Sequence, residues 1–106
     1  DDLLQAIEAS AQAVEDPAWR LPLWDAYDEM LKSEVADLAN SSGSPMGGAI
    51  VAAMFSKRFV PPASKWAHLD TYAWRDAGKP GRPKGGDALG LRAVFDMLCK
   101  RYGRGD

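Results

Sequence analysis

The chain is poor in the residues that build disulfide frameworks and metal centres, with one cysteine, Cys99, and one histidine, His68, among 106 residues. A single cysteine excludes an internal disulfide, and these two residues are too few for a zinc site of cysteine and histidine ligands. Cys99 lies among apolar residues at helical spacing. This position predicts a buried and inert thiol.

The sequence also lacks an apolar run of the roughly 18 residues needed to cross a bilayer. It has no basic and then apolar segment at its start, as a secretion signal would. We therefore expect no membrane contact and a cytoplasmic, reducing location. The chain starts at Asp1 without an initiator methionine, and we expect it to be a piece of a longer chain.

Neither sign of charge is in large excess, since the formal net charge is −2, but the charges are unevenly placed. Residues 1–16 carry five acidic and no basic residues, whereas residues 75–104 carry eight basic and three acidic ones. Such a split occurs in proteins that bind nucleic acid or membranes, and also in chains whose ends face each other or different partners. Charge alone does not choose between these readings.

Four segments are predicted to be helical, at residues 2–15, 25–32, 49–60 and 88–102, because their apolar residues recur at helical spacing. Asp87 is the expected N-cap of the last helix. The segment 49–60 is apolar nearly all round, which predicts burial on most sides, against a sheet or a neighbouring subunit. The predicted packing face of the last helix consists of Leu89, Leu91, Val94, Phe95, Leu98 and Cys99.

Short apolar segments at residues 35–39 and 66–72 are predicted to form strands. Residues 19–24 are interrupted by a proline and are predicted to form an edge strand or an extended segment. Residues 40–48 and 75–86 are glycine-rich loops, the second being neither helix nor central strand. The alternation predicts an α/β fold with a partial mixed sheet of a few short strands flanked by helices. So few strands would leave an unpaired sheet edge, which favours part of a larger sheet.

Within the predicted strand 66–72, His68 and Asp70 would lie on the same side. They could serve as a base with its orienting carboxylate, or as two ligands of a metal ion. The alternative is structural, with His68 hydrogen-bonded in the sheet and Asp70 paired with a base or with backbone amides. The scarcity of further ligands favours the structural reading.

The loop Gly43-Ser-Pro-Met-Gly-Gly-Ala49 precedes a predicted helix, as phosphate-binding loops do. It lacks the Lys-Ser/Thr that completes the P-loop signature. A tight loop that lets the helix approach a neighbouring backbone is the alternative.

The loop 75–86 is rich in cations and follows two aromatic residues, Tyr72 and Trp74. Aromatic and cationic residues together could bind single-stranded nucleic acid or a carboxylate, or the loop could be a solvated linker. A free-standing nucleic-acid or anion-binding module would use Trp74, Arg75, Lys79, Arg82 and Lys84.

The final Arg104-Gly105-Asp106 matches an integrin-recognition tripeptide, but so short a match is frequent by chance and we discard it.

Five motifs occur in a fixed order, namely Trp19-Arg-Leu-Pro-Leu-Trp24, Ala36-Asp-Leu-Ala-Asn40, Gly47-Gly-Ala-Ile50, Trp66-Ala-His-Leu-Asp70 and Gly81-Arg-Pro83. In their order and spacing they resemble the C-terminal part of the catalytic domain of the leucyl aminopeptidase (cytosol aminopeptidase) family. The resemblance extends over residues 17–102, and several motifs in register are far more specific than any one of them.

The resemblance implies that residues 1–106 are one incomplete segment of a larger three-layer peptidase domain. The parent enzyme would be a cytoplasmic exopeptidase that removes N-terminal residues from peptides, using two divalent metal ions, Mn or Zn, and forming a hexamer. Some family members also bind DNA. The family's metal ligands, its catalytic lysine and its Asn-Thr-Asp-Ala-Glu-Gly-Arg motif lie upstream of the corresponding segment and do not occur here. We therefore expect no catalytic or metal-binding residue in this chain, and no activity from it alone.

The resemblance also implies a role for the residues that follow Asp70, which in the family contribute to the pocket for the substrate's N-terminal side chain. The implied substrate-binding residues are Thr71, Tyr72, Trp74 and Arg75. Tyr72 stands where the family often has alanine, and Arg75 where it often has an apolar residue. A large side chain at Tyr72 would make the pocket smaller or change which substrate side chain it prefers. The residue type that the enzyme prefers to remove is therefore not predicted.

Overall fold

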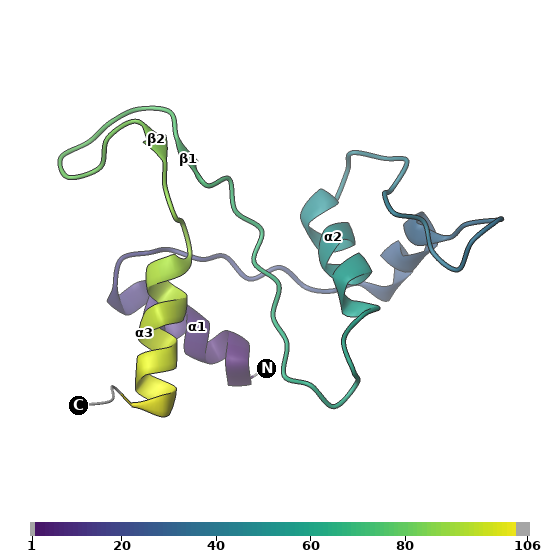
Figure 1. Cartoon of the computed structure of the whole chain (residues 1–106), viewed down its shortest axis with the longest axis horizontal. Helices are drawn as coiled ribbons and strands as arrows, with labels where there is room; N and C mark the ends of the chain where they lie inside the picture. The colour runs from purple at the N-terminus through teal and green to yellow at the C-terminus, as the bar shows by residue number, and fades with distance from the viewer. Residues whose placement is uncertain (1, 104–106) are drawn as a thin grey trace. The chain divides into compact units, whose positions relative to one another are not determined.

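The computed structural model describes residues 2–103 and is rich in helices (Figure 1). Its elements are α1 (Asp2–Ala13), the 3₁₀-helix η1 (Asp25–Leu31), α2 (Gly48–Lys57), β1 (Trp74–Arg75), β2 (Gly85–Gly86) and α3 (Leu91–Tyr102). The helices and the small antiparallel sheet are consistent with part of an α/β domain, the predicted class. Residues 2–20 and 69–103 form one compact unit, and residues 21–68 form another.

In the first unit, α1 packs against α3 (Figure 1). The buried apolar residues are Ile7 and Ala11 of α1 and Ala93 and Met97 of α3. Each pair is four residues apart and therefore lies on one face of its helix. Helix α1 forms within the predicted segment 2–15 because its apolar residues give it a single packing stripe.

Helix α3 begins later than predicted, and Asp87 does not cap it. Its N-cap is Gly90, in a left-handed conformation with φ of 89°. The backbone amides of Gly90 and Ala93 instead donate hydrogen bonds to the carboxylate of Asp16, each at 3.1 Å. Asp16 is only 2% exposed. The chain after α1 therefore provides the cap that the helix needs.

The predicted packing face of α3 is only partly correct. The residues that the helix buries are Ala93 and Met97, and Cys99 is half-buried instead of buried. The apolar side chains that remain exposed are Leu89, Leu91, Phe95 and Leu98. Because α3 packs on one helix in this unit, only a narrow stripe of its broad apolar surface is covered.

The loop predicted for residues 75–86 forms a β-hairpin. Trp74 pairs with Gly86 and Arg75 with Gly85. Nearer the tip, the backbone amides of Lys79 and Arg82 each donate to the other residue's carbonyl at 2.8 Å. The hairpin projects beyond the N-terminal end of α3 (Figure 1). It is neither helix nor central strand, as its glycines and prolines predict.

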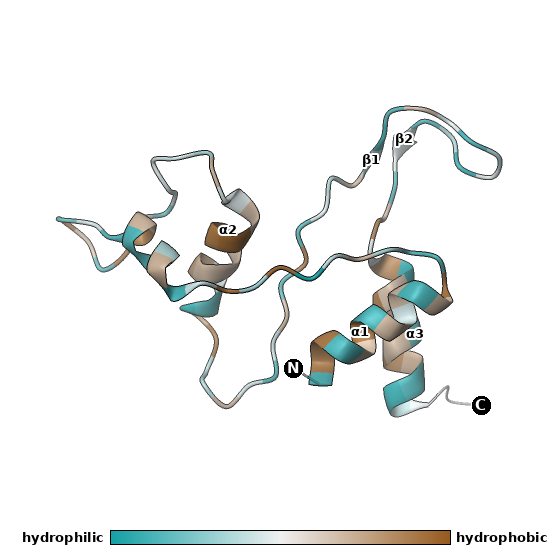
Figure 2. Ribbon diagram, turned by 180° about the vertical axis from the view of Figure 1, so that it is seen from behind, coloured by the Kyte–Doolittle hydropathy of each residue, from teal (hydrophilic) through white to brown (hydrophobic). Residues whose placement is uncertain are grey.

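In the second unit, α2 packs against η1. The core consists of Leu31, Val51 and Met54, surrounded by half-buried Tyr27, Met30, Leu38, Ile50 and Phe55. The apolar character of α2 is visible in its brown ribbon (Figure 2). Val51, Ala53 and Met54 are buried and Ile50 and Phe55 are half-buried, so burial on most sides is confirmed within this unit, with Ala52 exposed. The helix packs on η1 and not on a sheet.

The three predicted strand segments form no strand. At residues 35–39, the hydroxyl of Ser33 accepts hydrogen bonds from the amides of Val35 and Ala36, at 3.2 and 3.0 Å. Local bonds of this kind compete with strand pairing. Residues 66–72 and 19–24 are also irregular. Within the described residues they lack a partner strand, and a strand cannot satisfy its backbone groups alone.

Candidate functional site

The four residues implied as substrate-binding lie together on the strand β1 and the segment that leads into it. Thr71 is exposed, Tyr72 is 69% exposed and Trp74 is 47% exposed. The hydroxyl of Tyr72 donates to Oδ1 of Asp76 at 3.3 Å. Two large aromatic side chains thus stand on the surface, which is unusual unless another molecule or segment covers them.

Arg75 is the best-anchored of the four. Its Nε and Nη2 atoms donate to Oδ2 of Asp87 at 3.0 and 2.6 Å. Arg82 donates from Nη1 to the other carboxylate oxygen of Asp87 at 3.3 Å. One carboxylate therefore holds two guanidinium groups at the base of the hairpin. Such charge-assisted bonds are stronger and shorter than neutral ones.

Sequence reasoning missed Asp87 as part of this site, because its position before a helix indicated a cap. The available signal was the hairpin itself. Residues on either side of a loop with several glycines and prolines come close when the loop closes, and an acid on one side can then meet a base on the other. Predicting that Asp87 pairs with Arg75 and Arg82 requires the register of the hairpin, and the periodicity of apolar residues in the sequence does not provide it.

The cations of the hairpin do not form one free basic surface. The two arginines among these cations, Arg75 and Arg82, are both engaged by Asp87. Nothing in the structure or in the comparisons below supports the free-standing nucleic-acid module.

His68 and Asp70 do not lie on a strand, because residues 66–72 are irregular. The imidazole of His68 lies 6.4 Å from the indole of Trp66, measured between ring centroids. Asp70 is exposed. The argument that alternation brings the two side chains to one face of a strand is therefore wrong.

Within residues 2–103, no three histidine, cysteine, aspartate or glutamate side chains gather closely enough to hold a metal ion. The residues that the structure describes thus do not fit a metal centre. Over the same range, no helix is both long and apolar enough to cross a membrane. The tripeptide Arg104-Gly105-Asp106 lies outside the described residues.

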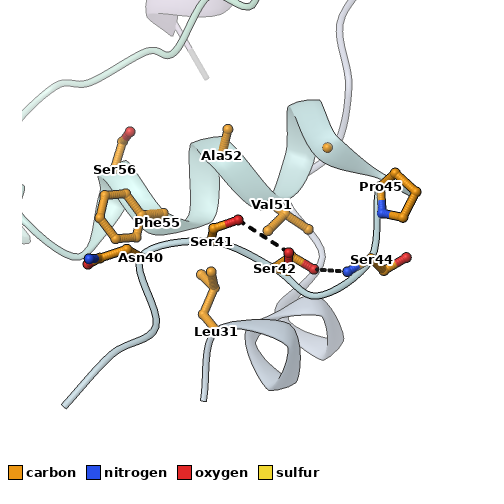
Figure 3. A pocket seen from close by; sticks show the side chains of 11 residues that line it. Leu31, Asn40, Ser41, Ser42, Ser44, Pro45, Val51, Ala52, Phe55 and Ser56 are labelled. Carbon is orange, nitrogen blue, oxygen red and sulfur yellow. Dashed lines mark hydrogen bonds between the residues drawn. The ribbon is translucent and has the colours of Figure 1, made fainter. Parts of the chain in front are cut away.

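The glycine-rich loop at residues 40–48 borders an open groove of about 320 Å³ between η1 and α2 (Figure 3). Its walls include Leu31 and Phe55, and its rim carries the hydroxyls of Ser41, Ser42 and Ser44. These hydroxyls are used within the loop, since Ser42 accepts from the amide of Ser44 at 3.1 Å. The rim contains no cation, so the phosphate-cradle reading gains no support.

Gly47, at the end of this loop, is the N-cap of α2 and has a left-handed φ of 66°. A Cβ atom there would lie 3.4 Å from the side chain of Tyr27, which is an ordinary contact distance. The backbone conformation, which glycine adopts without strain, is therefore the reason that this position favours glycine.

A second groove of about 340 Å³ in the same unit is lined by Trp66, Pro61 and the ion pair of Asp28 with Arg58. Arg58 donates a hydrogen bond to the carboxylate of Asp28, and this bond together with the negative charge of Asp28 raises the pKa of Arg58. The pair links η1 to the end of α2. Its role is thus explained by the packing of this unit.

A sequence profile described as the cytosol aminopeptidase family, catalytic domain, matches residues 1–95. The chain belongs to this aminopeptidase family. The family is a peptidase family, which agrees with the resemblance carried by the five motifs.

Relatives in this family include a probable cytosol aminopeptidase of Geobacter sulfurreducens, 43% identical over 98 residues, which cover 91% of this chain and 19% of that protein. A probable cytosol aminopeptidase of Prochlorococcus marinus is 38% identical over 103 residues, covering 95% of this chain and 21% of that protein. The chain thus spans about a fifth of the length of these curated relatives.

A solved structure agrees with the same assignment. The crystal structure of the cytosol aminopeptidase from Coxiella burnetii matches with a TM-score of 0.89 and 50% sequence identity. The match covers 98% of this chain and 22% of that one. The conformation described here is therefore similar to one found within a much longer aminopeptidase chain.

Proposed function

We propose that this chain is the C-terminal segment of an aminopeptidase catalytic domain that removes N-terminal residues from peptides. The observation that carries the proposal is the family match over residues 1–95, joined to the TM-score of 0.89 against one part of a longer cytosol aminopeptidase. The remainder of that domain is the segment's principal partner. The whole protein works in the cytoplasm, as the names of its relatives suggest.

Catalysis depends on two divalent ions, Mn or Zn, held by parts of the enzyme that this chain does not contain. The described residues offer no cluster of ligands for them. The segment is therefore inactive alone, and its contribution is to binding and assembly.

Its contribution to binding is one wall of the pocket for the substrate's N-terminal side chain. Thr71, Tyr72, Trp74 and Arg75 form this wall. The role of these four residues is supported by their place within residues 71–75, on and just before β1, and by the exposure of the large aromatic side chains of Tyr72 and Trp74. Such side chains are well suited to contact an apolar or aromatic substrate group.

The segment also takes part in assembly of a hexamer, the form that the resemblance implies for the family. Exposed apolar side chains of α3 and the exposed Ala52 of α2 are available for contacts with the remainder of the domain or with another subunit. Sedimentation of the full-length enzyme tests the hexamer. A monomer at micromolar concentration would contradict it.

The decisive experiment compares the purified 106-residue chain with the full-length enzyme that carries it, using leucine p-nitroanilide. The full-length enzyme should release p-nitroaniline, lose activity with a chelator and recover it with Mn²⁺ or Zn²⁺. The isolated chain should release none, and equilibrium dialysis should detect no tight Mn²⁺ binding. Hydrolysis by the isolated chain, or a chelator-resistant parent enzyme, would contradict the proposal.

A further inference from the structure

Asp87 occupies the base of the β1–β2 hairpin and binds across it in two ways. Its side chain is only 10% exposed and accepts hydrogen bonds from Arg75 and Arg82. Its backbone amide donates to the carbonyl of Ala73 at 3.0 Å. The residue thus links both strands and the segment that precedes them.

The backbone at Ala73 is unusual. Its φ is 54°, in the left-handed region that alanine rarely adopts. Ala73 lies between Tyr72 and Trp74, so its conformation decides how these two side chains diverge. The hydrogen bond from the Asp87 amide holds the carbonyl of this strained residue in place.

The two aromatic side chains of this region have little packing around them. Tyr72 is 69% exposed and bonded to Asp76, and Trp74 is 47% exposed. Each strand of the hairpin contains two residues. A two-stranded sheet is marginal by itself in water. The carboxylate of Asp87 therefore adds side-chain bonds to the short backbone pairing that joins the two sides of the hairpin.

The charges at Asp87 are not balanced, since one carboxylate serves two guanidinium groups. Removal of one arginine leaves an ordinary ion pair. Removal of the carboxylate charge leaves two cations facing each other in a partly buried place, where repulsion is weakly screened. The geometry therefore makes Asp87 the most sensitive member of the group.

We propose that Asp87 is a positioning residue of the substrate pocket, which holds Arg75 and Arg82 together and thereby sets the directions of Tyr72, Trp74 and Arg75. This inference rests on the proposed function, because it concerns the pocket for the substrate's N-terminal side chain. Arg75 is then part of the pocket's support as well as its wall.

The test measures kcat and KM of the full-length enzyme for alanine, leucine, phenylalanine and arginine p-nitroanilides. Asp87→Asn should change the ratio of kcat/KM between the largest and smallest side chains by about tenfold, mainly through KM, since pocket contacts discriminate by such factors. The kcat for the alanine substrate should stay within about threefold of the wild type. Asp87→Glu, which keeps the charge, should recover most of the wild-type ratio.

Asp96→Asn is the matched control, because it also removes an aspartate charge and an ion pair, that of Asp96 with Lys100 at 2.6 Å, in the same unit. It should leave the selectivity unchanged. If Asp87→Asn does not fold, Arg82→Lys, which keeps the charge but loses the planar fork, should shift the ratio in the same direction by less.

Two outcomes are distinguishable as failures. A wild-type enzyme that hydrolyses none of the substrates overturns both the proposed function and this inference. An active wild type whose Asp87→Asn form loses activity equally for all substrates, or loses none, overturns this inference alone. If Asp87 had a purely structural role, Asp87→Asn would lower the fraction of active enzyme and leave the ratios of kcat/KM between substrates unchanged.

Discussion

At the scale of single residues, Ala73 has the strained backbone conformation within the proposed pocket wall. Ala73 and Glu15 are the non-glycine residues within 2–103 with a left-handed backbone, both with φ of 54°. Such a conformation costs an L-residue roughly 1–2 kcal/mol. The cost at Ala73 is met in part by the hydrogen bond from Asp87 and by hairpin pairing on its C-terminal side.

Replacement of Ala73 should therefore have opposite effects according to the residue introduced. We expect Ala73→Gly to raise the free energy of unfolding by up to about 1 kcal/mol, because glycine accepts positive φ without strain. We expect Ala73→Val to lower it by about 2 kcal/mol, because a β-branched residue tolerates this region poorly. Urea-induced unfolding measures both.

Ala52→Gly provides the contrast for this pair. Ala52 lies exposed in α2, where glycine costs about 1 kcal/mol relative to alanine. The same chemical change should thus destabilise at position 52 and stabilise at position 73. Destabilisation of equal size at both positions would contradict the strain assigned to Ala73.

At the scale of elements, the start of α3 depends on a residue far away in the chain. Asp16 follows α1 and lies 74 and 77 positions before the amides of Gly90 and Ala93 that it binds. The carboxylate also complements the positive end of the helix dipole. Helices α1 and α3 are thus joined by a polar tie as well as by their apolar stripe.

Asp16→Ala should lower the free energy of unfolding by about 2 kcal/mol, since it removes a buried cap and leaves two amides without their acceptor. Hydrogen exchange should show faster exchange in the first turn of α3. Asp16→Asn keeps one acceptor oxygen and should cost less. The exposed Asp37 of the other unit serves as control, and Asp37→Ala should leave α3 protection unchanged.

At the scale of the whole molecule, helix α3 exposes apolar surface that α1, its partner in the same unit, does not cover. Phe95 on α3 is 59% exposed, whereas Met97 on the same helix is buried. Soluble proteins seldom expose several large apolar residues on one helix. The relatives are longer, since this chain spans about a fifth of their length.

Phe95→Ala should accordingly behave differently in the two contexts. In the 106-residue chain we expect a change in unfolding free energy under about 1 kcal/mol, because little burial is lost. In the full-length enzyme we expect about 3 kcal/mol, as for a buried phenylalanine. Met97→Ala should cost about 3 kcal/mol in both, because α1 covers Met97 in either case. An equally small loss for Phe95 in both proteins would show that this face stays open.

The predictions from sequence agree with the structure where the interactions are local along the chain, and they fail where the interactions join distant residues. Helices α1 and α2, and the absence of a helix or central strand at residues 75–86, were predictable because helical spacing, glycines and prolines act within a few residues. The hairpin that residues 75–86 form was not predicted. The strands at residues 35–39 and 66–72 were not, since a strand needs a partner and local bonds from Ser33 compete at the first of them. The family was predictable because five short motifs carry it independently of how they fold.

The sequence alone determined the family and most of the helical segments, because motifs and helical spacing are local, and the four pocket residues remain a prediction that the family resemblance implies. Only the tertiary structure decided that Asp16 caps α3, that Asp87 binds Arg75 and Arg82 and does not cap a helix, and that Ala73 takes a left-handed turn. These contacts join positions 5 to 77 residues apart. Their geometry depends on how α1, α3 and the hairpin pack, which no local pattern encodes.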